Sequence, residues 1–393
     1  MVNEKIYCDY NATTPIDPLV LAEMAAMARE HFGNPSSSHC FGKPAADIVK
    51  RSRQQVATLI GGRAEEICFT AGGTESDNLA LKGVVMPLLA QGCKAHLIIS
   101  AVEHPAVEES CRYLESIGAV VTRLPVAADG TLTADQVGAA INEDTVLVSL
   151  MLANNETGVL FPLSEIAALT RAKNILLHTD AVQAAGKVEI DVNALGVDLL
   201  SLSGHKLYAT KGVGALWIRS GVELEPLLHG GGQENGLRSG TENLVGMAAL
   251  GVACELLSAK MIDEGRRVSA LRDRLELGLA DGLDQQLIFH GHRQLRVPNT
   301  ISLSVPYVDG ESLLAHLDIE DIAVSAGSAC SSGEHQGSPV LRAMGVSSDL
   351  AQGSLRISLG RWSTASEVDI FIEKFSTIVR RLWAISPLYS PTP

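Results

Sequence analysis

Short apolar runs alternate with helical patterns along the first two thirds of the chain. Amphipathic stretches separate five such runs, at residues 66–73, 96–105, 145–158, 175–183 and 197–206. Uninterrupted apolar runs of this length are typical of strands that are covered on both faces, because a strand with one face exposed to solvent alternates between apolar and polar residues. The pattern therefore predicts an α/β fold with a mainly parallel sheet and helices on both sides.

Two helices are predicted before the first of these runs. Residues 17–33 have Asp17 as a potential N-cap, Pro18 at the first helical position and Gly33 beyond the end. Residues 45–62 repeat this design.

The character of the chain changes near residue 262. A charged helix at 263–283 is followed by a strand at 297–305, a short helix near 310–318 and a strand at 354–360. The last helix opens with the capping box from Thr364 to Glu367. We therefore predict two domains, which are a large domain at residues 14–261 and a smaller α+β domain formed by residues 1–13 together with 262–393.

Composition and charge narrow the class of protein. The 393 residues are 46% apolar and 19% charged, which is typical of a soluble globular protein, and the net charge of −14 disfavours nucleic acid as a partner. The first twenty residues lack the apolar segment of a signal peptide. We expect a cytoplasmic protein, although a chain whose transit peptide had been removed would look the same.

Cysteine usage singles out one thiol. The seven cysteines contain no CxxC pair, which argues against a disulfide framework or a zinc site, so no metal is expected. Cys330 lies in a run of Ser, Gly and Ala at about residues 324–338, where little apolar bulk is available for packing. Reactivity explains a thiol in such a loop better than burial does.

Polar clusters follow the apolar runs, where ligands of parallel sheets bind. Lys206 could be a phosphate anchor, a surface charge or an amine that forms a Schiff base. Asp180 ends a run without a basic neighbour, and a buried carboxylate needs a cationic partner such as a protonated pyridine nitrogen. Pyridoxal phosphate requires this lysine and this carboxylate. Gln183 could then bond the phenolic oxygen of the ring.

Further clusters have a functional and a structural interpretation each. Gly73 and Thr74 could cradle a phosphate at a helix N-terminus, or they simply begin a helix; their spacing matches neither a P-loop nor GxGxxG. His104 could stack on a flat ring or move protons, or it is an ordinary polar residue. Asn155 could contact the ring or the substrate, or it is a turn residue.

Two residues further along could bind anions. Arg356 lies on an apolar strand, where it suits the carboxylate of an amino-acid substrate or an internal ion pair. Thr241 belongs to the glycine-rich stretch 230–243, which suits a mobile wall of a site or a subunit contact that carries a hydroxyl to a phosphate.

Taken together, these motifs resemble the cysteine desulfurases, which are pyridoxal phosphate enzymes of the aminotransferase class V superfamily with fold type I. Eleven segments occur in the order of that family over nearly the whole chain. They are DYNATTP, FGNPSS, FTAGGTESDN, EHPAV, LANNETG, HTDAVQAAGK, SGHKLYATKGVGALW, GGGQENGLRSGTEN, VPNT, GSACSSG and LRISLGR.

The resemblance implies a role for each candidate residue. Lys206 would form the Schiff base with pyridoxal 5'-phosphate, His104 would stack on its ring, and Cys330 would be the nucleophile. Asp180 would contact the ring nitrogen and Gln183 the phenolic oxygen. The phosphate would be bound by Gly73, Thr74, Ser203 and His205, and Thr241 would reach the phosphate of the second subunit of a homodimer. Asn155 and Arg356 would contact the substrate.

The implied reaction converts L-cysteine to L-alanine and leaves the sulfur as a persulfide on Cys330. An iron–sulfur scaffold or another acceptor protein would then take the sulfur. A loop of small residues would allow the thiol to move between the cofactor and the acceptor protein. Selenocysteine lyases share the same residues and are the alternative enzyme. A non-catalytic relative is disfavoured because Lys206 and Asp180 are both present.

Overall fold

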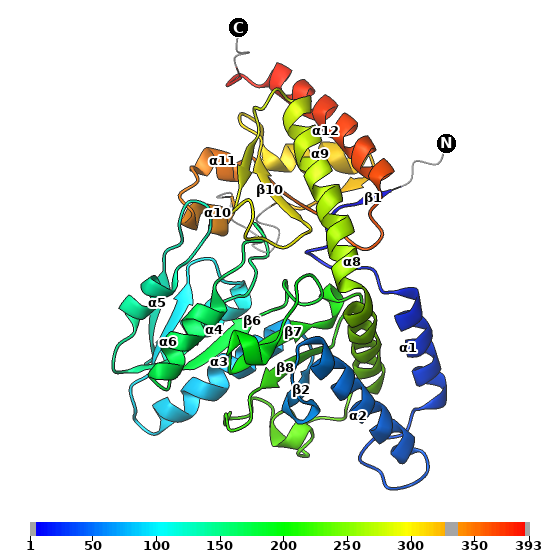
Figure 1. Ribbon diagram of the computed structural model, residues 1–393, viewed down its shortest axis with the longest axis vertical. Helices are drawn as coiled ribbons and strands as arrows, with labels where there is room; N and C mark the ends of the chain where they lie inside the picture. Colours follow the sequence, from blue (N-terminus) through cyan, green and yellow to red (C-terminus); the bar gives the residue numbers. More distant parts are fainter. Residues whose placement is uncertain (1–4, 327–336, 390–393) are drawn as a thin grey trace.

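A seven-stranded sheet forms the centre of the larger part of the molecule (Figure 1). The computed structural model describes residues 5–326 and 337–389. The strands lie in the order β2 (Ile67–Thr70), β8 (Gly214–Ile218), β7 (Leu199–Ser203), β6 (Leu176–Asp180), β5 (Thr145–Ser149), β3 (His96–Ser100) and β4 (Val120–Leu124). β8 runs antiparallel to both of its neighbours, and the other pairs are parallel. The predicted α/β fold with a mainly parallel sheet is confirmed.

Helices bury both faces of this sheet. One apolar cluster contains Leu97 and Ile99 of β3 and side chains of α3 (Gly73–Ala90) and α4 (Pro105–Ser116). Ile98, between them in sequence, belongs to the opposite cluster. That cluster is completed by α2 (Gly42–Leu59), α5 (Ala134–Ala140), α6 (Leu163–Ala172), α7 (Val192–Leu195) and the first half of α8 (Leu244–Gly282). Burial on both faces explains why the strands have uninterrupted apolar sequences.

The helix α8 is continuous over 39 residues. The start predicted for the separate helix at 263–283 is therefore wrong. The helix begins after Asn243, which caps it at Gly246 N, and no proline interrupts it. Leu257 packs in the large core and Leu275 in the small one. By length and composition α8 could cross a membrane, but half of its apolar window is buried inside the protein, as expected of a core helix.

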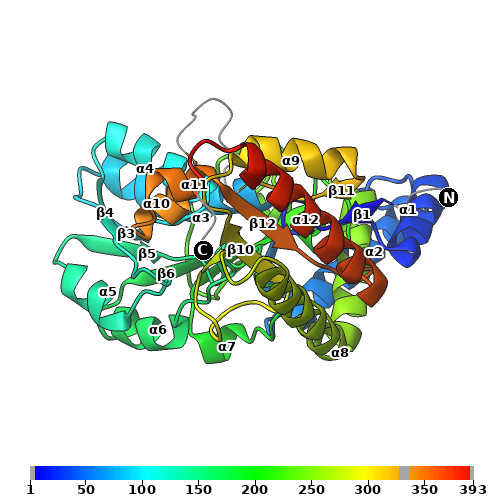
Figure 2. The same ribbon diagram turned by 90° about the horizontal axis from the view of Figure 1, so that it is seen from above.

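The smaller part is a second apolar core around an antiparallel sheet (Figure 2). Its strands lie in the order β12 (Ser354–Ser358), β10 (Thr300–Ser304) and β9 (Ile288–His290). The helices α9 (Gly310–Ile319) and α12 (Ala365–Ile385) pack in the same core, and β1 (Ile6–Tyr7) pairs with β11 (Ile322–Ala323). Two short helices, α10 (Pro339–Ala343) and α11 (Ser348–Gln352), precede β12. The domain boundaries at 14 and 262 stay a prediction.

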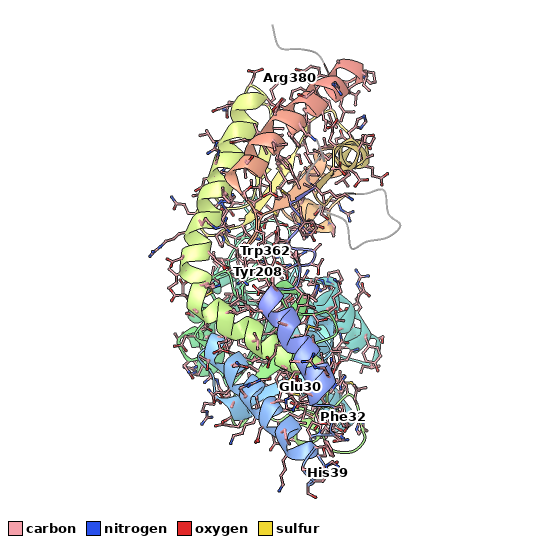
Figure 3. The ribbon with its side chains drawn as sticks, turned by 90° about the vertical axis from the view of Figure 1, so that its right-hand side faces the viewer. Glu30, Phe32, His39, Tyr208, Trp362 and Arg380 are labelled. Carbon is pink, nitrogen blue, oxygen red and sulfur yellow. The ribbon has the colours of Figure 1, made fainter. Side chains whose placement is uncertain are left out.

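An aromatic and ionic contact joins the two parts beside α1 (Pro18–Glu30). Tyr208 and Trp362 lie side by side, with ring centroids 5.4 Å apart (Figure 3). The guanidinium of Arg361 lies over the Tyr208 ring and bonds Oδ2 of Asp17 at 2.6 Å. The C-terminal region is thus attached to the start of α1.

Local sequence signals gave several element ends correctly. The Asp17 side chain accepts a hydrogen bond from Leu19 N at the start of α1, and Thr364 and Glu367 form the predicted capping box. The helix predicted at 45–62 begins earlier, at Gly42, without a side-chain cap. Two strands of the large sheet, β4 and β8, were not predicted: β4 is an edge strand with its first residue exposed, and β8 follows a turn without a helical spacer. The short strands β1, β9 and β11 of the smaller part were not predicted either.

The core of the smaller part makes a stability prediction. Phe371 is fully buried and stacks on Phe375, whereas the adjacent Ile370 is 41% exposed. We expect Phe371→Ala to lower the free energy of unfolding by about 3–5 kcal/mol, because a cavity replaces the ring. Ile370→Ala, as the matched control, should cost less than about 1 kcal/mol. Urea unfolding measures both, and equal losses would contradict this packing.

Candidate active site

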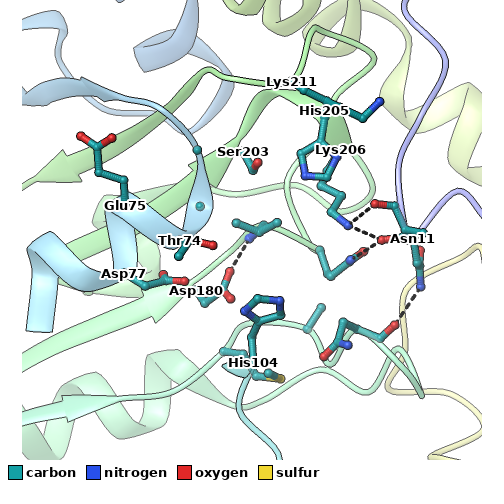
Figure 4. Close-up of a pocket in the computed structure, with 18 of the residues that line it drawn as sticks. Asn11, Thr74, Glu75, Asp77, His104, Asp180, Ser203, His205, Lys206 and Lys211 are labelled. Atoms are coloured by element: carbon teal, nitrogen blue, oxygen red, sulfur yellow. Dashed lines mark hydrogen bonds between the residues drawn. The ribbon is translucent and has the colours of Figure 1, made fainter. Parts of the chain in front are cut away.

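A cavity of about 920 Å³ opens at the carboxyl ends of the parallel strands (Figure 4). Ten of the twelve predicted site residues line it, which are Gly73, Thr74, His104, Asn155, Asp180, Gln183, Ser203, His205, Lys206 and Arg356. Thr241 does not line it, and Cys330 lies outside the described residues. The expected convergence of strand ends on one crevice is therefore observed, while the role of each residue stays a prediction.

Lys206 is held by the N-terminal segment. It ends a short 3-10 helix, η2 (Gly204–Lys206), directly after β7. Its Nζ donates to the backbone carbonyl oxygens of Asn11 at 2.5 Å and Ala12 at 2.7 Å. The Thr14 hydroxyl donates to His205 O and accepts from Tyr208 N, which fastens the two segments to each other. Residues 11–14 thus fix the direction in which the lysine side chain extends.

Asp180 and His104 face each other across the floor of the cavity (Figure 4). Asp180 ends β6 and accepts a hydrogen bond from Val182 N at 2.8 Å; burial raises its pKa, and His104 opposes the rise. His104 caps α4, and its Nδ1 accepts from Ala106 N at 3.1 Å. Burial lowers the pKa of His104, so its single proton lies on Nε2.

A layer of buried acids behind Asp180 was not predicted. Asp77 is 1% exposed, and its Oδ1 has no hydrogen-bond partner among the described residues. Burial, followed by the Asp180 charge, raises the pKa of Asp77 well above its ordinary value. Ligand atoms of Asp77, His104 and Asp180 lie within 4.8 Å of one another. The two carboxylates, and Asp180 in particular, therefore favour a cationic group such as a protonated ring nitrogen at this point.

The other end of the cavity suits an anion. The N-terminus of α3 contributes Gly73 and Thr74, and Ser203 and His205 face them from the end of β7. A Cβ on Gly73 would lie 2.8 Å from Cγ2 of Val182, so a larger residue does not fit there. Lys211, which was not predicted as a site residue, adds a cation near His205 (Figure 4). Burial lowers the pKa of His205 to about 4.

The sequence left two roles open for Arg356, an internal ion pair and the binding of a substrate carboxylate, and the structure is compatible with both. It extends from β12, donates to Asp9 Oδ1 at 3.0 Å in an internal ion pair and donates to Asn155 O at 3.1 Å. Its Nε is buried and has no hydrogen-bond partner among the described residues. Because Arg356 also lines the cavity, its guanidinium can bind a ligand carboxylate there.

The ends of the predicted nucleophile loop are attached at the cavity. Ser325 pairs with Arg356 through two backbone hydrogen bonds, of 3.2 and 2.7 Å, and lines the cavity. At the other end the Ser338 hydroxyl bonds Oε2 of Glu156, a side chain whose pKa burial raises to about 7. The segment before Cys330 thus lies in the cavity wall, and the segment after it is attached to Glu156, which follows the lining residue Asn155.

Thr241 is exposed in the described chain. The loop before it is held by Glu234, which pairs with Arg53 at 2.7 Å and accepts from Phe69 N at 2.8 Å. Arg238 of the same loop bonds Oε1 of Glu75 at 2.9 Å, next to the anion end of the cavity.

Comparisons with known proteins identify the family. The family described as aminotransferase class-V matches residues 6–371. The chain belongs to this family. A "Cysteine desulfurase IscS" of Dictyoglomus turgidum is 43% identical over 98% of this chain and 97% of its own length. A protein of the same name from Anaeromyxobacter sp. (strain Fw109-5) is 48% identical over 98% of this chain and 95% of its own length.

Solved structures of similar sequence agree in fold. A "NIFS-LIKE PROTEIN" superposes with a TM-score of 0.90 at 37% identity and covers 96% of this chain and all of its own. The structure "SspA in complex with cysteine" has a TM-score of 0.80 at 35% identity, over 92% of this chain and all of its own. The resemblance to cysteine desulfurases and the fold type I architecture are confirmed.

Glu103 supplies a test of the acid layer. Its carboxylate accepts from the Ser100 hydroxyl at 2.5 Å and from Met151 N at 3.1 Å, and burial raises its pKa to about 8. A carboxyl whose pKa is raised on folding keeps its stability contribution below its unfolded pKa, near ~4.3, and loses it as the pH rises through the folded value. The wild type should therefore lose stability relative to Glu103→Gln between pH 5 and pH 8.5.

The expected change in the difference is roughly 1–3 kcal/mol, because the amide avoids ionisation in the buried site. Urea unfolding at both pH values measures it. Glu109→Gln, an exposed position on α4, is the matched control and should give the same difference at both. A difference for Glu103→Gln that does not change with pH would show that this carboxyl titrates normally.

Proposed function

We propose that this protein is a pyridoxal-phosphate-dependent cysteine desulfurase, acting on L-cysteine as a cytoplasmic homodimer. The observation that carries the proposal is the arrangement of Lys206, the Asp77–His104–Asp180 group and Arg356 around one cavity. The near-full-length similarity to proteins named cysteine desulfurase supports it.

The residues of the cavity fit the cofactor at three points. The buried Asp180, which lines the cavity, calls for a cation, which the ring nitrogen supplies when it is protonated. The helix terminus at Gly73 and Thr74 offers N–H groups to the phosphate, together with Ser203 and His205. Lys206 would hold the cofactor covalently. When bound, the cofactor acts as an electron sink that makes the Cα–H of the amino acid acidic.

The protein's own residues then bind the substrate and move its protons. Arg356, which lines the cavity, binds the α-carboxylate through its guanidinium, while Asp9 and Asn155 O hold the guanidinium in place. The Lys206 amine takes the proton from Cα. His104 packs against the ring and carries its exchangeable proton on Nε2, on the side away from Ala106 N.

Cys330 completes the reaction as the nucleophile. Its thiolate attacks the substrate sulfur, and a new S–S bond forms while the Cβ–S bond breaks. The electron pair of the broken bond takes up a proton at Cβ, and Lys206 returns a proton to Cα, so the products are alanine and a persulfide on Cys330. A sulfur-acceptor protein, such as an iron–sulfur scaffold or a carrier for thio-cofactors, then takes the terminal sulfur from the loop.

Two surface features support a homodimer. Thr241 is exposed beside a firmly anchored loop, where it would reach the phosphate of the second subunit. Phe32 is 73% exposed at the end of α1, with its ring centroid 5.4 Å from that of the exposed Phe41 (Figure 3). Exposed aromatic pairs of this kind are typical of surfaces that a partner covers.

An absorption experiment tests the function. With pyridoxal phosphate the wild type should show a band near ~420 nm, the usual position of a protonated lysine adduct. Adding L-cysteine should change this band and yield alanine with a persulfide on Cys330. Cys330→Ser, the matched variant, should keep the band and lose the persulfide.

No band in the wild type would exclude the proposed cofactor site. A band that responds to selenocysteine and not to cysteine would indicate a selenocysteine lyase instead. Equal sulfur transfer by Cys330→Ser would remove the nucleophile assignment.

A second prediction concerns substrate binding. Arg356→Gln should raise the KM for L-cysteine by about 10- to 100-fold, because one charge-assisted hydrogen bond to the carboxylate is lost. Arg356→Lys should recover part of the loss, since it keeps the charge but not the fork. Asp9→Asn is the control for the internal ion pair, and an unchanged KM in Arg356→Gln would leave Arg356 only a structural role.

A further inference from the structure

Lys187 is a cation at the site to which the proposed mechanism gives no task. It follows β6 by seven residues, and its Nζ donates to Gln183 Oε1 at 2.6 Å and to Asn11 Oδ1 at 3.1 Å. Gln183 lines the cavity, and Asn11 is the residue whose backbone carbonyl holds Lys206. Lys187 therefore reaches the cavity indirectly, through two side chains that border it.

The contact with Gln183 fixes the orientation of a side-chain amide. Lys187 Nζ donates to the amide oxygen of Gln183, so this oxygen faces Lys187. The amide nitrogen then lies on the other side, where it donates one hydrogen to Asn11 O at 2.9 Å. The second hydrogen of that nitrogen stays available to a ligand in the cavity. The opposite orientation would place two donors, Lys187 and the Gln183 NH₂ group, against each other.

Asn11 cannot relieve this constraint, because its polar atoms are engaged. Its Oδ1 also accepts from Asn299 Nδ2 at 3.0 Å, and its Nδ2 donates to Thr300 Oγ1 at 2.8 Å. Its backbone carbonyl accepts from both Gln183 and Lys206. A rotation of the Gln183 amide would therefore cost the hydrogen bond to Asn11 O as well as the one to Lys187.

The surroundings of Lys187 do not suit a purely stabilising ion pair. Burial lowers its pKa well below the ordinary value, and the charges of Lys206 and Arg356 lower it further. A cavity of about 30 Å³ borders Lys187, and its other titratable lining residues are Tyr10, Lys206, Tyr208, Glu264 and Arg361. An ammonium held by two neutral oxygens near other cations is a costly arrangement for folding alone, and such local conflicts occur at functional positions.

We propose that Lys187 is a positioning residue, which locks the Gln183 amide so that an N–H group, and not the C=O group, faces the phenolic oxygen of the cofactor. The inference rests on the proposed function, because it assigns the ring contact of Gln183. A hydrogen bond donated to that oxygen stabilises its negative charge. It therefore lowers the pKa with which the visible absorption band of the bound cofactor titrates, called the band pKa below. Loss of the lock should raise this pKa.

A double-mutant cycle with a spectroscopic readout tests the proposal. The pH titration of the visible band is measured in the holoenzyme for the wild type, Lys187→Met, Gln183→Met and the double variant. Lys187→Met should raise the band pKa by roughly one unit, the size of one hydrogen bond to a charged group. The same substitution in the Gln183→Met background should shift it much less. Lys187→Arg, which still only donates, should stay close to the wild type.

Two outcomes would overturn the positioning role while leaving the proposed function intact. Equal shifts in both backgrounds would mean that Lys187 acts directly through its charge, and no shift at all would mean that Gln183 is oriented without it. If instead the wild type takes up no cofactor, the proposed function fails. The thermal unfolding midpoints of the same four proteins without cofactor then test the contact between Lys187 and Gln183. If the two single substitutions lower the midpoint additively in the double variant, the two side chains do not interact.

Discussion

The site depends on the cost of burying negative charge at the end of β6. Asp180 is enclosed together with Asp77 and Glu103, and burial raises the pKa of all three carboxyls. Only a proton or a cation at this point relieves the cost. The floor of the cavity is thus built to attract a positively charged group, and the same electrostatic demand would keep a ring nitrogen protonated.

The N-terminal segment ties this floor to the rest of the site. Asp9 bonds Arg356 of the small sheet, and Asn11 bonds Lys206 at the end of the large one. Asn11 N also donates to the Ser358 hydroxyl at 2.9 Å. A short irregular segment therefore sets the distance between the lysine and the arginine, although each lies on a different core. Its conformation is determined by contacts with distant parts of the chain, and not by any local periodicity.

Much of this arrangement was readable from the sequence because strand ends carry local signals. Lys206, Asp180 and His104 each follow an apolar run, and the rules for parallel sheets bring such ends together. Asp77 and Lys187 were not found, because a charge inside a helix or after a turn looks like a solvated residue until the packing around it is known. The continuity of α8 was missed for a related reason: its exposed middle looks like the beginning of a new helix. The convergence of Asn11 with Gln183 and Lys206 has no signal in any short window.

The pairing of the first residues with the last third of the chain also sets an order of folding. β1 pairs with β11 at Ile322, and Asp9 pairs with Ser358 of β12. Contacts between residues so far apart in sequence form late, since a long loop must close before they contribute. During synthesis the large sheet can be complete while β1 and Asp9 still lack their partners in the last third of the chain. The nascent chain therefore has the part of the cavity around Asp180 and His104 before it has the part formed by Ser325 and Arg356. The site is complete only after the C-terminal region has left the ribosome.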